Sequence, residues 1–189
     1  MPLALYGHPF SSYTQKVLIA LYENGTDFEF RCIGPDTPEH AAEWARRWPL
    51  RLLPEDPMAA LEVRFLDRCF DLHVMDAAQV AVSAALGRLG QLTVDAGQAI
   101  SRERLEPAYA WFDARLGDGP WAAGRDFSMA DCAAAPSLFY ADWVHPIGAQ
   151  YPALRAYRTR LLARPAFARA VDEARVYRPL FPLGAPDRD

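Results

Sequence analysis

The sequence has few cysteines and no long apolar run, and each absence excludes a class of protein. Its 189 residues contain three cysteines, at positions 32, 69 and 132, which are far apart and form no CxxC pair. We therefore expect neither a disulfide framework nor a redox pair, but buried, unreactive thiols in a reducing compartment. No stretch of roughly 18 consecutive apolar residues is present, which argues against a membrane-spanning helix.

A strong charge of one sign is also absent. The formal net charge is −4 at pH 7, and 19 of the 20 basic residues are arginine. Such a balance offers no extended positive field for a nucleic-acid backbone or an anionic membrane. Residues 1–8 lack the charged start and long apolar segment of a signal peptide, so a cytoplasmic protein is expected. The histidines are scattered, at positions 8, 40, 73 and 145, which predicts no metal site.

Residues 1–50 alternate between strand-like and helix-like patterns. The strands are predicted at residues 3–6 and 28–33, and the helices at 13–24 and 39–48. Ser11 and Ser12 directly precede the first helix, where either hydroxyl can cap its N-terminus. This order predicts an α/β arrangement for the first part of the chain.

From residue 51 the pattern changes. Residues 51–57 contain two prolines and acidic side chains and are predicted to be a linker. Residues 58–189 are predicted to form an all-helical domain, because apolar residues recur there at helical spacing. The predicted helices span residues 58–86, 101–116, 152–163 and 165–177, with a further capped helix after Ser128. Ser128 and Asp131 match a capping box, so Asp131 is interpreted as a folding residue and not as a catalytic acid.

Three stretches of the sequence resemble the cytosolic glutathione transferases. Tyr6–Val17 is similar to the active-site segment of their serine-type classes. Glu43–Leu50 is similar to the end of their second helix, although Trp48 replaces the usual asparagine. Asp126–Pro136 resembles the capped helix of their C-terminal domain. The chain is thus identified as a theta- or zeta-like bacterial member, which implies a thioredoxin-like first domain over residues 1–50 and an all-helical second domain.

One part of the family pattern is missing between Leu50 and Arg51. The resemblance implies two further strands and a helix there, with a cis-proline and an acidic–serine pair that grips the glutamyl end of glutathione. Average elements give this segment about 25–32 residues. Either the protein has lost the segment, or the sequence as printed omits it. The second explanation is favoured, because a two-stranded parallel remnant with open edges should fold poorly.

The reaction implied by the resemblance needs the thiolate of glutathione. A free thiol has a pKa of about 8.5, and lowering it by about two units requires ~2.7 kcal/mol. A helix N-terminus supplies about 0.3–1 kcal/mol, and a hydroxyl that donates to the anion about 1.5–3 kcal/mol. The family pattern makes Ser11 the expected catalytic donor, with Ser12 as the alternate. Tyr6 and Tyr13 are interpreted as packing residues.

The remaining site residues are expected from the same resemblance. Ser11, Ser12 and His40 are expected to bind glutathione, with His40 at the glycyl end. The electrophile pocket is expected to be apolar and to contain Phe10, Phe70, His73, Tyr109 and Phe112. Each of these could equally be a core residue. A homodimer through the long helix near Phe65 and Arg68 is implied, with glutathione as cosubstrate and no metal.

Two functions remain open. The favoured one is transfer of the glutathione thiolate to a small apolar electrophile, whose identity the sequence does not specify. The other is a non-catalytic module, because a transferase fold without the glutamyl grip could bind hydrophobic ligands or mediate dimerisation. A glutathione-dependent reductase is disfavoured, since the first helix begins at serine and not at cysteine. A serine hydrolase is disfavoured because no G-x-S-x-G sequence is present.

Overall fold

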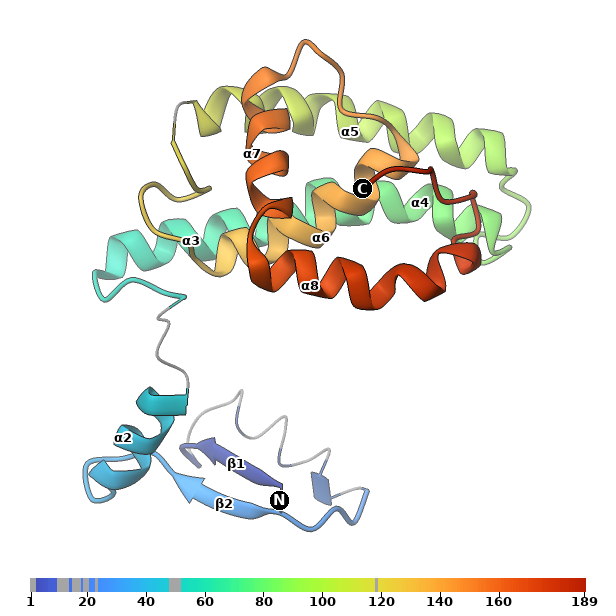
Figure 1. Ribbon diagram of the computed structural model, residues 1–189. Coiled ribbons are helices and arrows are strands. Elements are labelled where there is room, and N and C mark those ends of the chain that lie inside the picture. The colour runs from blue at the N-terminus through green and yellow to red at the C-terminus, as the bar shows by residue number, and fades with distance from the viewer. Residues whose placement is uncertain are drawn as a thin grey trace. The chain divides into compact units, whose positions relative to one another are not determined.

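The structure, a computed structural model, describes residues 3–9, 14, 18, 21–22, 24–47, 52–117 and 119–189. It consists of two compact units, Met1–Arg51 and Leu52–Asp189 (Figure 1). The first is thioredoxin-like with a two-stranded sheet, and the second is mostly helical, which confirms the predicted fold class. In the described part of the chain, no helix is both long and apolar enough to cross a membrane.

The sheet of the first unit is built from two short parallel strands, β1 (Ala4–Gly7) and β2 (Glu29–Cys32). Their register pairs Gly7 with Cys32. Parallel strands need a crossover connection, and its described residues at positions 14, 18, 21 and 22 are helical, as the sequence predicts. Because the strands are parallel, their carboxyl ends lie at the same edge of the sheet.

Helix α2 (Pro38–Arg47) packs against one face of this sheet. The ring of Trp44 lies 5.9 Å from that of Tyr6 on β1, measured between centroids. Arg31 of β2 donates a hydrogen bond of 2.7 Å to Glu43 of the helix. One aromatic pair and one ion pair therefore hold α2 to both strands.

The second unit begins with one long helical segment composed of three parts. These are α3 (Pro57–Cys69), the π-helical η1 (Phe70–Met75) and α4 (Asp76–Ala85). Asp56 caps the segment, because its carboxylate accepts a hydrogen bond of 2.8 Å from the amide of Ala59. The extent agrees with the predicted helix over 58–86, but the predicted regularity does not. In η1 the amide of Asp76 donates to the carbonyl of Asp71, five residues earlier.

The remaining helices are α5 (Val94–Leu116), α6 (Met129–Val144), α7 (Pro152–Leu162) and α8 (Pro165–Ala174), followed by the 3-10 helix η2 (Arg175–Leu180). Helix α5 begins earlier than the predicted residue 101, because Thr93 caps it by accepting a hydrogen bond from Ala96. Gly97 lies in this additional part. A Cβ added to Gly97 would lie 2.6 Å from the Cβ of Ala84, so this poor helix former allows α4 and α5 to approach closely.

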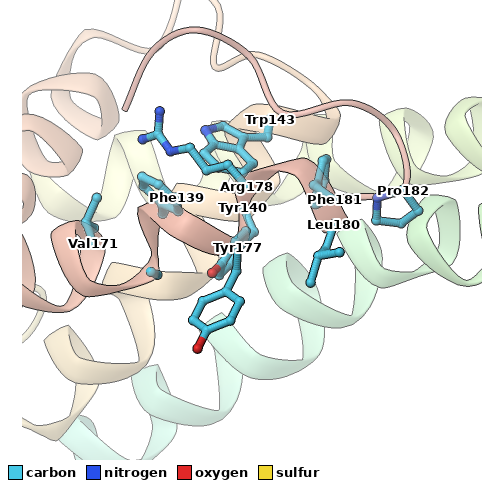
Figure 2. A pocket seen from close by; sticks show the side chains of 10 residues that line it. Phe139, Tyr140, Trp143, Val171, Tyr177, Arg178, Leu180, Phe181 and Pro182 are labelled. Atoms are coloured by element: carbon cyan, nitrogen blue, oxygen red, sulfur yellow. The ribbon is translucent and has the colours of Figure 1, made fainter.

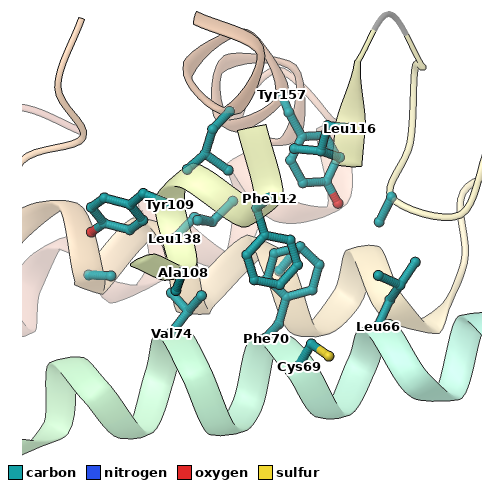
Figure 3. Close-up of a cluster of buried hydrophobic side chains, with 14 of the residues drawn as sticks. Leu66, Cys69, Phe70, Val74, Ala108, Tyr109, Phe112, Leu116, Leu138 and Tyr157 are labelled. Atoms are coloured by element: carbon teal, nitrogen blue, oxygen red, sulfur yellow. The ribbon is translucent and has the colours of Figure 1, made fainter. Parts of the chain in front are cut away.

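The core of the second unit is a stack of aromatic side chains surrounded by aliphatic ones (Figure 3). Phe70 and Phe112 stack with 4.0 Å between ring centroids, and Tyr157 lies 6.4 Å from Phe70. All three side chains are buried. Phe70 and Val74 of the π turn both point into this core, whereas His73 is exposed on the outer surface.

A single buried carboxylate ties three segments of the second unit together. Asp131 of α6 accepts hydrogen bonds from the amides of Ala122 and Ser128, both at 2.8 Å. It also accepts from the hydroxyls of Ser128 at 2.9 Å and Tyr157 at 2.6 Å. The predicted capping box is therefore present. Because Asp131 is fully buried and accepts four hydrogen bonds, its role is structural.

Candidate functional site

The carboxyl edge of the sheet is where the sequence predicts the thiol-binding residues. Phe10, Ser11 and Ser12 lie outside the described residues. Gly7 and Thr14, which precede and follow these residues in the sequence, lie in close contact with each other. A Cβ added to Gly7 would lie 2.5 Å from Oγ1 of Thr14. Glycine is therefore required for the end of β1 to contact the following helical residue.

His40 lies at the same edge, in the first turn of α2. Its Nδ1 is 2.8 Å from the carbonyl oxygen of Cys32, and the hydroxyl of Thr37 donates to that oxygen at 2.8 Å. Because a carbonyl oxygen only accepts, Nδ1 carries a proton and donates to it, which leaves the Nε2 edge of the ring for other partners. Cys32 pairs with Gly7, the last residue of β1. The hydrogen bond to Cys32 therefore holds the His40 ring at the carboxyl edge of the sheet.

The Tyr6 side chain contacts other residues on the face of the sheet that α2 covers. Its hydroxyl accepts a hydrogen bond from Arg31 and helps to lower the pKa of Glu43. Its ring packs on Trp44. These contacts agree with the interpretation of Tyr6 as a packing residue, whereas Tyr13 lies outside the described residues.

The second unit contains an apolar cavity of about 380 Å³, which we call the α3–α5 cavity. Its lining comes from α3 and η1 on one side and α5 on the other: Phe65, Cys69, His73, Arg104, Pro107, Ala108, Trp111 and Phe112. The rings of Phe65 and Trp111 meet edge to face at 6.2 Å, and those of Trp111 and Phe112 at 4.9 Å. A cavity of this size with aromatic walls suits a small organic ligand.

The residues predicted for the electrophile pocket separate into two groups. His73 and Phe112 line the α3–α5 cavity. Phe70 and Tyr109 instead lie in the core and are 0% exposed. Phe70 stacks behind Phe112, while the Tyr109 hydroxyl donates to the carbonyl of His145 at 2.9 Å. Because neighbouring helices enclose both side chains, neither offers surface to a ligand.

Sequence reasoning missed Phe65, Arg104 and Trp111 as cavity residues. The available signal for Phe65 is its four-residue spacing with Cys69 and His73, which places all three on one helical stripe. No comparable signal exists for Arg104 and Trp111, because their positions depend on how α5 lies against α3.

The α3–α5 cavity has few ionisable side chains in its lining. Burial raises the pKa of the Cys69 thiol, and nearby Glu62 raises it further, so this thiol stays protonated at neutral pH. Arg104 supplies a permanent positive charge at the wall. Among the described residues, no three His, Cys, Asp or Glu side chains are grouped as metal ligands would be. The cavity lining therefore offers an apolar surface and one cation, but no ionised thiol.

A second cavity, of about 310 Å³, lies between α6, α8 and the residues that follow α8 (Figure 2). Phe181 packs edge to face on Trp143 at 5.2 Å, and the guanidinium of Arg178 lies 5.3 Å from the Trp143 ring centroid. Arg178 also pairs with Asp189. These contacts fasten the last residues of the chain to α6.

Comparisons with known proteins match both units. The model of the glutathione S-transferase N-terminal domain matches residues 5–54, and that of the C-terminal domain matches residues 74–160. A curated glutathione S-transferase of Hyoscyamus muticus is 31% identical over 86 residues. That match covers 44% of this chain and 41% of the relative, so it spans less than half of that protein's length.

Solved structures share the fold. A glutathione S-transferase of Methylobacterium radiotolerans, in complex with glutathione sulfonate, is 26% identical with a TM-score of 0.53. The similarity covers 89% of this chain and 93% of that one. Gtt2 of Saccharomyces cerevisiae is 22% identical with a TM-score of 0.56, over 88% of this chain and 99% of that one.

Proposed function

We propose that this chain, which belongs to the glutathione S-transferase family, transfers the glutathione thiolate to small apolar electrophiles. The observation that carries the proposal is the match of both family domains, in the family's order, along one chain. The reaction forms a bond between the glutathione sulfur and an electrophilic carbon. The leaving group departs with the electron pair of the broken bond.

Ser11 is proposed as the catalytic residue, donating a hydrogen bond to the sulfur anion. A hydrogen bond to a charged group contributes about 1.5–3 kcal/mol. At ~1.36 kcal/mol for each factor of ten, its loss lowers the acid dissociation constant of the bound thiol roughly 13- to 160-fold. Ser12 is proposed to contact glutathione without activating the thiol.

His40 is proposed to bind the glycyl end of glutathione. Because Nδ1 donates to the carbonyl oxygen of Cys32, the Nε2 edge of the ring is the one left to contact the tripeptide.

The α3–α5 cavity is proposed to hold the electrophile. Trp111 and Phe65 give it aromatic walls, which favour planar apolar substrates. Arg104 can interact with a polar, electron-withdrawing substituent.

A homodimer through α3 is also proposed, with glutathione as cosubstrate and no metal. Met58, Leu61 and Phe65 of this helix are 70%, 56% and 49% exposed, so α3 presents several large apolar side chains to solvent. Arg68 pairs with Asp71 along the same helix at 3.2 Å. Light scattering coupled to size-exclusion chromatography should give a molar mass of twice that of one chain. The Leu61→Arg variant should give the mass of a single chain.

The test of the proposed function separates binding from turnover. Glutathione affinity is measured by calorimetry, and conjugation is measured with a chlorodinitrobenzene as electrophile. Ser11→Ala should lower kcat at least tenfold and leave the Kd for glutathione within about twofold. Ser12→Ala, which removes the neighbouring hydroxyl, is the matched control and should retain most of kcat. Absence of measurable glutathione binding by the unmodified chain would contradict the proposal.

A non-catalytic ligand-binding or dimerisation module is the second candidate. The observation that favours it is the sheet, which has two strands in the described part of the chain. The family's glutamyl contacts belong to the strands and helix that the sequence lacks. Under this alternative, apolar ligands still bind the α3–α5 cavity, as Trp111 fluorescence can report, while glutathione does not bind.

A further inference from the structure

The carboxyl end of α6 and helix α7 enclose a polar cavity that the transferase reaction does not use. Its volume is about 370 Å³. We call it the arginine pocket, after its lining of Asp142, Pro146, Ile147, Arg155, Arg158, Thr159 and Arg188. Three guanidinium groups and one carboxylate give it a formal charge of +2. Such a surplus is uncommon where some of the charges are buried.

The carboxylate of Asp142 is already fully engaged. Its Oδ1 accepts a hydrogen bond of 2.8 Å from the amide of Ile147, and its Oδ2 accepts one from Arg188. Arg188 also donates to the main-chain carbonyl of Asp142 at 2.9 Å. Arg158 approaches the same Oδ2 at 3.3 Å without forming a hydrogen bond. One buried carboxylate therefore pairs with two guanidinium groups, of which only that of Arg188 is hydrogen-bonded to it.

Arg158 is left with buried donors that lack partners. Its side chain is 12% exposed, and its Nε and Nη2 atoms are buried with no hydrogen-bond partner in the described structure. Burial lowers the pKa of this guanidinium, which remains charged at neutral pH. The nearby carboxylate of Asp189 is occupied by Arg175 and Arg178. Arg158 therefore shares the Asp142 carboxylate with Arg188 and keeps two buried donors without a hydrogen bond. Such donors are costly to bury, so a further anion is expected to complete the site.

We propose that the arginine pocket binds a phosphate group, either as free phosphate or as a phosphomonoester. A dianion matches the +2 surplus, and the guanidinium fork of Arg158 suits bidentate contact with phosphate oxygens. Arg155, which also lines the pocket, supplies a second guanidinium. Since one water takes up about 30 Å³ in the liquid, the cavity has room for a small organic group beside the phosphate. Pro146 and Ile147 give that group an apolar wall.

Thermal unfolding of the full chain in phosphate and in chloride, at equal ionic strength and pH, tests this proposal. Phosphate should raise the midpoint in a saturable manner. At a hundredfold excess over its Kd, it should lower the unfolded-to-folded ratio about a hundredfold. Equal stabilisation by chloride would overturn the proposal, because it would indicate screening and no site.

Variants of the pocket arginines locate the effect. Arg158→Gln and Arg155→Gln should each weaken phosphate binding at least tenfold. Arg169→Gln on α8, which removes an exposed arginine that pairs only with Glu173 among the described residues, is the matched control and should bind phosphate normally. If Arg158→Gln does not fold, Arg155→Gln carries the test, because Arg155 is exposed and has no side-chain partner in the described structure. An unchanged phosphate effect in Arg155→Gln would then contradict the proposal.

Phosphorus NMR titrations distinguish the two sources of the phosphate group. Tighter binding of phenyl phosphate than of inorganic phosphate assigns the site to a phosphomonoester. Equal affinity assigns it to the free ion. Either result supports the site, whereas binding of neither would overturn it. Since glutathione plays no part in these measurements, their outcome is independent of the proposed transferase function.

Discussion

At the scale of single residues, Glu43 in α2 shows how neighbours keep a surface carboxylate ionised. Arg47 donates two hydrogen bonds to it, at 2.9 and 2.7 Å, and Arg31 donates another at 2.7 Å. Arg47, then Tyr6 and Arg31, lower the pKa of Glu43 to about 2. A lowered pKa means that the ionised form favours the folded state. This contribution is complete above pH 4.5, the ordinary value, and is lost as the pH falls towards 2.

An NMR titration of the Glu43 side-chain carboxyl checks this shift directly. We expect a midpoint near pH 2 in the unmodified protein, and a clearly higher midpoint in Arg47→Gln. Arg46→Gln, in the same helical turn, is the matched control and should leave the midpoint unchanged. A midpoint near 4.5 in the unmodified protein would show that the ion pairs have no effect in solution.

Gly7 is the residue whose substitution should disturb the candidate thiol site most directly. Gly7→Ala introduces a Cβ at 2.5 Å from Oγ1 of Thr14, so β1 and the helical residue must separate. We expect a loss of about 1–3 kcal/mol in unfolding free energy, as for other overpacked positions, together with weaker glutathione binding. Chemical denaturation and calorimetry measure the two effects.

Two further variants test the cause of the Gly7→Ala effect. Thr14→Ala in the same chain removes the two closest clashing atoms and should restore part of the loss. Gly34→Ala is the control, since its added Cβ has no heavy atom closer than 3.7 Å. A similar loss in Gly34→Ala would indicate a general cost of replacing glycine in this unit.

At the scale of helices, one buried hydrogen bond is among the contacts that link α6 and α7. The Tyr157 hydroxyl donates to Asp131 at 2.6 Å in the core. Tyr157→Phe keeps the ring and removes this donor, so it should lower the unfolding free energy by about 1.5–3 kcal/mol. Tyr177→Phe, at an exposed position, should change it by less than ~0.5 kcal/mol. Equal effects in urea denaturation would contradict the assigned role of the hydroxyl.

The helices also show which features a sequence can predict. The capping box at Ser128 was predictable because both partners lie within four residues, and the structure contains it. The π turn at Phe70–Met75 was not, because nothing in its local composition distinguishes it from a regular helix. The start of α5 was missed because Gly97 weakens the helical pattern, and its packing on Ala84 is a tertiary contact.

Little of the candidate site follows from local spacing alone. His73 and Phe112 were expected in the electrophile pocket from the family resemblance, and both line the α3–α5 cavity. Phe70 was expected in the same pocket but faces the core, because it continues the buried stripe of Leu66 and Val74. Arg104 needs the arrangement of two helices before it can be recognised as a cavity residue.

At the scale of the whole molecule, the segment missing between Leu50 and Arg51 affects how glutathione could be held. Intact mass spectrometry distinguishes the two explanations for it. A mass near 21.1 kDa, the value for these 189 residues, indicates that the segment is lost. A mass about 3 kDa higher indicates two strands and a helix that the printed sequence omits. The first result would favour the non-catalytic alternative.

The central claim is that the chain binds glutathione and Ser11 stabilises its thiolate. The most direct test is the ultraviolet absorbance of the bound thiolate, recorded across pH in the unmodified protein and in Ser11→Ala. We predict a thiol pKa about two units below the free value of about 8.5, and a return of at least one unit towards it in the variant. A bound thiol that titrates like free glutathione, or an equal shift in both proteins, would contradict the account.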